Sequence, residues 1–330
     1  MPSQSFGKGY ERVVFHGRKA VTRVRPLRGV KQKMNRDNAL LKIERTGYAG
    51  RYAPSPTGRL HLGNLRTALV AWKRCREFDG KFILRIEDTD TTRLVAGAEE
   101  SIYHDLRCIG VTFDEGPYRQ SERGPIYTEA LLALARAGFL YPCRCSRKDL
   151  QAAASAPHGP DGPIYPGTCR PRDTLRETAW LEDLLTEGRW GASDIAVRFR
   201  TDLQPEISYF DQNTGAVPVN MPAEHGDFVL LRKDGLWAYQ LACAVDDALM
   251  GITEVARGED LRSSAARQVT IMQALGLPSP TYYHIPLVES ASGEKMSKRD
   301  GAEGLDSIVW KDRQDVSKLQ NFLMGLVLST

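Results

Sequence analysis

Two short segments, far apart in the chain, carry residue types suited to binding phosphate groups. The first, residues 54–64, places two prolines and two glycines around His61; the second, residues 295–299, contains Lys295, Lys298 and Arg299. Either pattern alone is common on protein surfaces. His61 and Lys295 lie 234 residues apart in one chain, and together the two segments predict one nucleotide site.

The first segment has the pattern of a strand, a loop and the start of a helix. Residues 48–53 suit a short strand, and the prolines that follow force a loop. From His61 the apolar residues recur at helical spacing until Gly80. Such a helix presents backbone N–H groups and a positive dipole end to an anion, and Gly63 would allow close approach. The alternative is an ordinary connection with an incidental histidine.

The second segment lies in a run of small, polar and charged residues, 290–301. This run has little apolar surface to anchor it, so we expect it to be mobile. Lys295, Lys298 and Arg299 could close over a triphosphate and neutralise the charge that builds as pyrophosphate leaves. The alternative is a solvated basic loop.

Length and composition fit one elaborated α/β enzyme. Of the 330 residues, 42% are hydrophobic and 26% charged, which is ordinary for a globular protein. No apolar run approaches the ~18–20 residues of a membrane span, so we expect no membrane partner. The six cysteines show no secreted pairing pattern and no signal peptide precedes them, which favours a cytoplasmic protein. We expect a monomer.

The net charge of +4 is unevenly distributed. Residues 1–50 contain twelve Lys/Arg and three acidic residues, a net of +9, which leaves −5 on residues 51–330. The basic block could be a nucleic-acid arm, a transit peptide, or the result of a start assigned too early, with Met34 the true beginning. We interpret residues 1–47 as a disordered or non-native extension.

Further elements follow from the apolar pattern. Strands are expected at 81–87, ending in an acidic turn at 88–90, and at 282–288. Helices are expected at 95–108, 126–137 and 261–275. A hairpin is expected within 228–239 around Asp234-Gly235. Alternating strands and helices predict a parallel sheet with nucleotide at the carboxyl ends of its strands. The expected parts are the extension 1–47, catalytic halves 48–140 and 223–285, an insertion 141–222, and a lysine loop with a helical segment, 286–330.

The expected insertion holds nine of the eighteen prolines and three cysteines: Cys143, Cys145 and Cys169. Three grouped thiols in a reducing compartment favour zinc over a disulfide. Zinc needs a fourth ligand, and chemistry alone nominates His158. The alternative is three unpaired structural cysteines. We expect the other cysteines, in apolar or helical surroundings, in the core: Cys75, Cys108 and Cys243.

Several segments resemble the glutamate branch of the class I aminoacyl-tRNA synthetases. They are residues 51–58, 85–90, 239–247 and 257–260, together with 61–64 and 295–299, which are similar to the HIGH and KMSKS signatures. The similarity spans about residues 48–310 and implies a Rossmann-like parallel sheet, a zinc-bearing insertion and a short helical C-terminal part. In two respects the chain departs from the pattern: Asn64 replaces the second histidine of HIGH, and the basic extension is additional.

Within this branch the chain is most similar to the short glutamyl-Q synthetases. Residues 300–330 are too few for a separate anticodon-binding domain, and the spacing C-x-C…Y-x3-C matches that family, which favours Tyr165 over His158 as the fourth zinc ligand. The resemblance implies a ligase that activates L-glutamate with ATP and Mg²⁺ and attaches it to the queuosine base of tRNA(Asp). It also implies one structural Zn²⁺.

The resemblance further implies roles for single residues. Arg51 and Arg257 would bind carboxylates, because a guanidinium does so bidentately, and Glu87 would bind the ammonium. The remaining glutamate-site residues are Tyr52, Ala53, Pro54, Ser55 and Tyr239. ATP would be bound by His61, Gly63, Asn64 and Lys298, and the residues acting in catalysis would be His61, Asn64, Lys295 and Lys298. The zinc ligands would be Cys143, Cys145, Tyr165 and Cys169. Each polar residue could instead be a surface ion pair or a strand-end group.

Three functions remain in competition. The leading one is glutamyl transfer to queuosine. The second is a truncated glutamyl-tRNA synthetase that charges a tRNA 3′ end. The third is a non-catalytic paralogue that senses an amino acid or RNA, against which His61, Lys295 and Lys298 argue, since a sensor has no need of groups that handle pyrophosphate.

Overall fold

The computed structural model describes residues 47–146, 148–149, 158–159, 162–171, 174–190, 194–287, 305 and 315–326. The basic extension up to residue 46 and the lysine segment 295–299 lie outside them.

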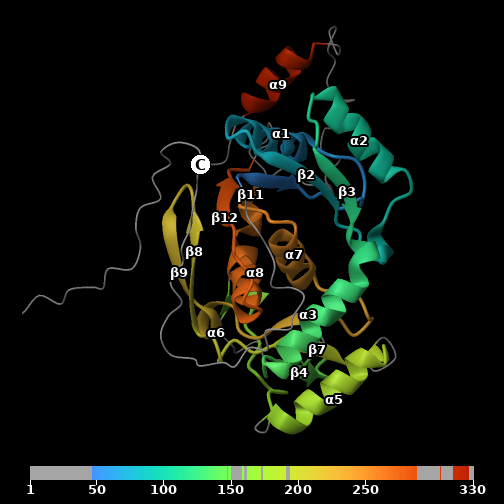
Figure 1. The fold of residues 1–330 in the computed structure, drawn as a ribbon, viewed down its shortest axis with the longest axis vertical. Helices are drawn as coiled ribbons and strands as arrows, with labels where there is room; N and C mark the ends of the chain where they lie inside the picture. The colour runs from blue at the N-terminus through green and yellow to red at the C-terminus, as the bar shows by residue number, and fades with distance from the viewer. Residues whose placement is uncertain are drawn as a thin grey trace, which may run out of the picture. The chain divides into compact units, whose positions relative to one another are not determined.

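Parallel strands form the central sheet (Figure 1). β2 (Lys81–Ile86) lies between β1 (Ala49–Tyr52) and β3 (Glu115–Arg119), and β11 (Glu254–Gly258) pairs with β12 (Thr281–Ile285). β11 lies beside β1, because the Thr253 amide donates to the Ala49 carbonyl at 2.9 Å and Arg51 Nη1 donates to the Ala256 carbonyl at 3.3 Å. The strand order β3-β2-β1-β11-β12 reverses between β1 and β11. In such sheets ligands bind in the crevice at this switch point.

Alternate side chains of each strand point to opposite faces of the sheet. On β2, Phe82, Leu84 and Ile86 pack in one apolar cluster with α1 (Leu62–Glu77) and α2 (Ala98–Cys108). Ile83 packs in a second cluster with α3 (Gly124–Arg136), α7 (Tyr239–Leu249) and α8 (Arg262–Ala274). Figure 1 shows α1 and α2 on one side of the strands and α7 and α8 on the other. By its parity, Arg85 lies on the α7 face.

The segment expected as an insertion contributes to two sheets. β4 (Leu140–Cys143) and β10 (Phe228–Leu231) flank β7 (Ala196–Phe199) in an antiparallel sheet, against which α5 (Thr174–Thr186) packs. The hairpin of β8 (Glu206–Asp211) and β9 (Gly215–Asn220) joins β12 instead, where Asp211 pairs with Tyr282. The remaining helices and strands are β5 (His158–Gly159), β6 (Gly162–Pro163), α6 (Met221–Glu224) and α9 (Val316–Met324), with short 3-10 turns η2 (Thr91–Arg93), η3 (Gln120–Arg123) and η5 (Glu259–Leu261).

The predicted α/β class with a parallel sheet is confirmed, and most predicted elements lie within two residues of those observed. The helix predicted from residue 95 begins at Ala98, because Gly97 adopts φ +77° and interrupts the helical path. The last strand, predicted over 282–288, is observed as Thr281–Ile285. Among the described residues, no helix is long and apolar enough to cross a membrane.

The predicted hairpin within 228–239 is only partly correct. The chain does reverse at Gly235 (φ +82°), and the Arg232 amide donates to the Leu236 carbonyl at 2.9 Å. The second arm, however, makes a single bridge, between Leu231 and Trp237, and β10 pairs mainly with β7. The arm stops because Tyr239 begins helix α7, a helix absent from the sequence-based predictions.

Candidate functional site

Three of the predicted glutamate-site residues come together at the switch point. Arg51 on β1 and Arg257 on β11 are both 4% exposed, and Glu87 directly follows β2. The Glu87 amide donates to the Pro54 carbonyl at 3.0 Å, which ties the loop after β1 to the end of β2. The strand ends therefore place two guanidinium groups and a carboxylate near one another at the switch point.

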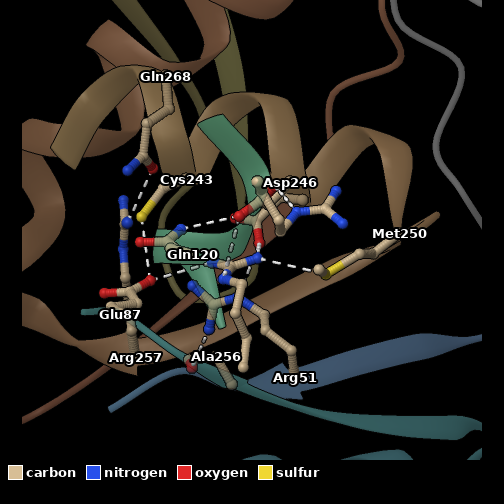
Figure 2. A network of polar contacts seen from close by, with 12 residues as sticks. Arg51, Glu87, Gln120, Cys243, Asp246, Met250, Ala256, Arg257 and Gln268 are labelled. Carbon is tan, nitrogen blue, oxygen red and sulfur yellow. Dashed lines mark hydrogen bonds and ion pairs between the residues drawn. The ribbon is translucent and has the colours of Figure 1, made fainter. Parts of the chain in front are cut away.

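Figure 2 shows the polar network around Arg51, Glu87 and Asp246. A residue without a predicted role, Arg85, joins this network through its own contacts. Arg85 is fully buried; its Nη1 donates to Asp247 Oδ1 at 2.7 Å and its Nη2 to Glu87 Oε1 at 3.1 Å. Asp246 Oδ2 lies 3.9 Å from Arg85 Nε. Arg51 Nε donates to the same Asp247 oxygen at 3.2 Å. One carboxylate of α7 therefore holds the arginines of two neighbouring strands.

Asp247 and Arg85 keep their charges in this buried network. Burial alone would raise the pKa of the Asp247 carboxyl, but Arg85 and Arg51 outweigh it and the pKa is lowered. Burial likewise opposes the charge of Arg85, yet its pKa is raised well above the usual value by Asp247, Cys243, Glu87 and Asp246. Four guanidinium groups interact with three carboxylates here, an excess of one positive charge: Arg51, Arg85, Arg123 and Arg257 with Glu87, Asp246 and Asp247.

One nitrogen of Arg257 has no hydrogen-bond partner among the described residues. Its Nη1 donates to Gln268 Oε1 at 2.9 Å, and its Nε lies 3.4 Å from His284 Nε2. Its Nη2 is buried without a hydrogen-bond partner among the described residues, as are Gln268 Nε2 and Tyr282 Oη. A buried donor without a partner is costly, and an anionic ligand is the natural acceptor for a guanidinium.

The first turns of α7 also contribute to this site. Tyr239 is its first residue, and Cys243, one turn later, donates its thiol hydrogen to Glu87 Oε1 at 3.0 Å. Burial, then Cys243 and Glu87, raise the pKa of Tyr239 well above its usual value, and burial with Glu87 does the same for Cys243. Both groups therefore remain neutral donors. Cys243 is buried, as predicted for a core residue, and it also contacts the site.

The predicted nucleotide residues lie at the start of helix α1. His61 is its N-cap, where its Nδ1 accepts the Asn64 amide at 3.3 Å and its carbonyl accepts the Leu65 amide at 3.1 Å. Gly63 and Asn64 belong to the first turn of this 16-residue helix, and Asn64 Oδ1 is buried without a partner among the described residues. Tyr52 packs in the apolar cluster and donates to the Asn64 carbonyl at 3.3 Å, so its ring links β1 to this turn.

The remaining predicted residues divide into two groups. Pro54 is buried in the loop after β1, and Ala53 and Ser55 are partly exposed beside it. Lys295, Lys298 and Arg299 lie outside the described residues. The residues that sequence reasoning missed are buried polar groups: Arg85, Asp246, Asp247, Asp211, Gln268 and His284. The available signal was a charged residue inside an apolar strand, at Arg85, and two acids inside an apolar helix, at 246–247.

A second candidate site lies at the end of β4. The thiols of Cys143, Cys145 and Cys169 offer donor atoms within 4.8 Å of one another, and they form the sole group of three or more metal-ligand side chains found in the described residues. Tyr165 Oη lies 3.5 Å from the sulfurs of Cys143 and Cys145 and accepts the Cys169 amide at 2.8 Å. Tetrahedral zinc with Zn–S bonds of ~2.3 Å separates its ligands by roughly 3.8 Å. The donor set therefore fits one zinc ion, whose binding would join the two segments 143–145 and 165–169.

One buried carboxylate anchors these segments to the antiparallel sheet. Asp227 Oδ2 accepts the Tyr141 hydroxyl at 2.7 Å and Arg170 Nη2 at 2.8 Å, and Thr201 donates to Oδ1. Tyr141 precedes Cys143 by two residues, and Arg170 directly follows Cys169. Arg198 Nη1 donates to the Asp227 carbonyl at 2.9 Å and lies over the Tyr165 ring, 3.9 Å from its centroid.

The other predictions on histidine and cysteine have mixed outcomes. His158 has its backbone in β5, but its side chain lies outside the described part of the structure. Cys75 is buried, as predicted. Cys108 is not: it is partly exposed at the end of α2, 3.5 Å from His104 Nε2, because it lies on the outward side of that amphipathic helix.

Fold and site together define a class I aminoacyl-tRNA synthetase. The protein-family model described as "tRNA synthetases class I (E and Q), catalytic domain" matches residues 49–328. The chain therefore belongs to this family of ligases. The chain is 45% identical over 271 residues to a glutamyl-Q tRNA(Asp) synthetase of Albidiferax ferrireducens, covering 79% of this chain and 87% of the relative. It is 46% identical over 270 residues to one of Symbiobacterium thermophilum, covering 78% and 80%.

Solved structures give the same class. The glutamate-tRNA synthetase of Elizabethkingia anophelis matches with a TM-score of 0.64 and 34% identity, covering 77% of this chain. A glutamate tRNA ligase of Elizabethkingia meningosepticum, solved in complex with its amino acid, matches with the same TM-score and identity. The chain spans about half the length of these two proteins, 53% and 52%.

Proposed function

We propose that the protein activates L-glutamate with ATP to glutamyl-adenylate and transfers the glutamyl group to the queuosine base in the anticodon of tRNA(Asp). Family membership supports the activation step, and the names of the relatives support the acceptor. The observation that carries the amino-acid assignment is Arg257, whose buried Nη2 has no partner among the described residues.

The charge of the network complements glutamate. The network has one positive charge in excess, and L-glutamate carries two carboxylates and one ammonium near neutral pH. We assign the carboxylates to Arg51 and Arg257, because both guanidinium groups are held in place by other contacts. Glu87 Oε1 already accepts from Arg85 and Cys243, so we assign its Oε2 to the ammonium. Ser55 and Tyr239 complete the hydrogen bonding.

The start of α1 is the proposed ATP site. Its first backbone amides and its dipole favour an anion, and His61, Gly63 and Asn64 occupy this turn. Adenylate formation needs the glutamate carboxylate in line with the α-phosphorus and neutralisation of the departing pyrophosphate. We assign the first task to the two arginines and His61, and the second to Lys295 and Lys298. Mg²⁺ bound with ATP would share in the neutralisation.

Activation is tested by pyrophosphate exchange into ATP. The purified protein with L-glutamate, Mg²⁺ and no tRNA should exchange, and aspartate or glutamine should support exchange far less well. Exchange with either of these but not with glutamate would refute the assignment of Arg51 and Arg257 to the two carboxylates.

The acceptor is tested on tRNA from cells with and without queuosine. Radiolabelled glutamate should enter tRNA only when queuosine is present, and the label should persist after periodate oxidation of the 3′ end. A truncated glutamyl-tRNA synthetase is the competing function, which the 34% identity to two glutamate-tRNA synthetases favours. Equal labelling of queuosine-free tRNA at its 3′ end would establish that function instead.

A further inference from the structure

A buried histidine connects Arg257 to a carboxylate on another strand. His284 on β12 is directly opposite Arg257 on β11 and is fully buried. Its Nδ1 is in close contact with Asp211 Oδ2, and its Nε2 lies 3.4 Å from Arg257 Nε. Asp211 ends β8, in the hairpin that joins this sheet from the segment expected as an insertion.

The partners fix which ring nitrogen of His284 carries the proton. A guanidinium has only donors, so Nε2 must accept from Arg257, and Nδ1 must then donate to Asp211. Burial and Arg257 lower the pKa of His284 to about 4, which keeps the ring neutral and this tautomer populated at neutral pH. In this chain of hydrogen bonds Arg257 donates to His284 Nε2, and His284 Nδ1 donates to Asp211.

Asp211 is itself fixed. Its Oδ1 accepts the Asn213 amide at 2.8 Å, and Asn213 Nδ2 donates to the His284 carbonyl at 2.6 Å. The turn after β8 is therefore attached to β12 at the residue that contacts Arg257. The Tyr282 ring stacks on His284 with an interplanar angle of 3°, which restrains the imidazole from one side.

Arg257 is consequently restrained at two of its nitrogens, by His284 at Nε and Gln268 at Nη1. The remaining nitrogen, Nη2, is the one without a partner among the described residues. We propose that Asp211 and His284 are positioning residues that orient the Arg257 guanidinium for a substrate carboxylate. This inference rests on the proposed function, in which Arg257 binds a carboxylate of L-glutamate.

The physical advantage is pre-organisation. A free arginine side chain has many rotamers, and fixing one when the ligand binds reduces affinity. An arginine already held at two nitrogens avoids most of that loss. Removing His284 should therefore weaken amino-acid binding and leave ATP binding unchanged.

The test compares two substitutions of His284 in the full chain by steady-state pyrophosphate exchange. His284→Phe keeps a ring stacked on Tyr282 but removes both nitrogens, whereas His284→Gln places an amide oxygen near the former Nε2. We expect His284→Phe to raise the KM for L-glutamate about tenfold, as for loss of a hydrogen bond to a charged group, with the KM for ATP unchanged. His284→Gln should recover most of that loss.

His284→Phe leaves the buried Asp211 with one partner fewer. If this variant does not fold, the double variant Asp211→Asn/His284→Phe removes the charge as well and should show the same rise. An unchanged KM for glutamate, or equal loss in the Phe and Gln variants, would overturn the inference. Pyrophosphate exchange by the wild-type protein tests the proposed function separately. If a different amino acid supports exchange and glutamate does not, glutamate is refuted as the substrate, and the His284 variants are then compared with that amino acid.

Discussion

Arg85 on β2 donates to Asp247 on α7 at 2.7 Å, and both side chains are fully buried although 162 residues separate them in the chain. The same Asp247 oxygen accepts from Arg51 on β1. This one carboxylate thus joins the sheet to the helix that covers it and also sets the position of a candidate substrate arginine. Stability and function are linked through Asp247.

Replacing Asp247 with Asn should destabilise the protein by about 3 kcal/mol, because a buried arginine loses its closest counter-charge. Urea unfolding followed by circular dichroism measures this loss. Glu187→Gln is the matched control, since its ion pair with Arg189 is exposed and should be worth less than about 1 kcal/mol. Equal effects of the two substitutions would contradict a structural role for the buried pair.

Arg257→Lys should lower kcat/KM for L-glutamate by about 100-fold in pyrophosphate exchange, because an ammonium cannot reproduce the planar contacts of a guanidinium. The KM for ATP should be unaffected. Arg76→Lys, in an exposed pair with Asp114, serves as the control and should retain wild-type kinetics. Equal losses for glutamate and ATP would indicate a general disturbance of the fold.

Sequence reasoning recovered the elements whose apolar pattern is regular. The strand at 81–86 was predicted within a residue, because its continuous apolar run reflects burial directly, and the helix at 262–274 also lies within a residue of its predicted bounds. Helix α7 was missed because the predicted hairpin runs to Tyr239, the first residue of the helix, and because Asp246 and Asp247 are buried within it although charged residues are usually exposed. The pairing of β8 with β12 was also beyond prediction, since contacts between distant strands leave no local pattern.

In the candidate site too, some residues were identified from the sequence and others were recognisable only in the structure. Arg51, Glu87 and Arg257 were identified through the resemblance to a family, and the structure brings them into one polar network (Figure 2). The residues that hold them, such as Asp247 and His284, were not, because a buried polar residue is recognisable only through its partners, and these come from other parts of the chain.

The free energy of unfolding should fall by about 2 kcal/mol between pH 7 and pH 5 because of His284. Burial and Arg257, with Arg262, lower its folded pKa to about 4 against the opposing effect of Asp211. The unfolded chain, with a histidine pKa near ~6.5, binds a proton in this range that the folded protein does not. Urea unfolding at both pH values measures the difference. The His284→Gln variant should lose most of this pH dependence, and an unchanged slope would refute the assignment to His284.

Tyr165 and His158 are the competing candidates for a fourth zinc ligand. We expect one zinc per chain in the purified protein, measured by elemental analysis, and its loss in Cys169→Ser. Tyr165→Phe should reduce zinc content or affinity, because the hydroxyl that contacts the thiols is removed. His158→Ala should leave both unchanged. Zinc retained in the tyrosine variant and lost in the histidine variant would reverse this assignment.

Asp227→Asn should accelerate zinc release to a chelator by about 10- to 100-fold, as is typical when a residue that orients metal ligands is changed. The reason is that Asp227 holds both Tyr141, next to Cys143, and Arg170, next to Cys169. Glu254→Gln is the matched control: Glu254 is a buried acid bound by Arg74, outside the cysteine cluster, and should cost stability without changing zinc release. Release rates measured under native conditions separate the two effects. Equal release rates in both variants would show that Asp227 supports the sheet and not the metal site.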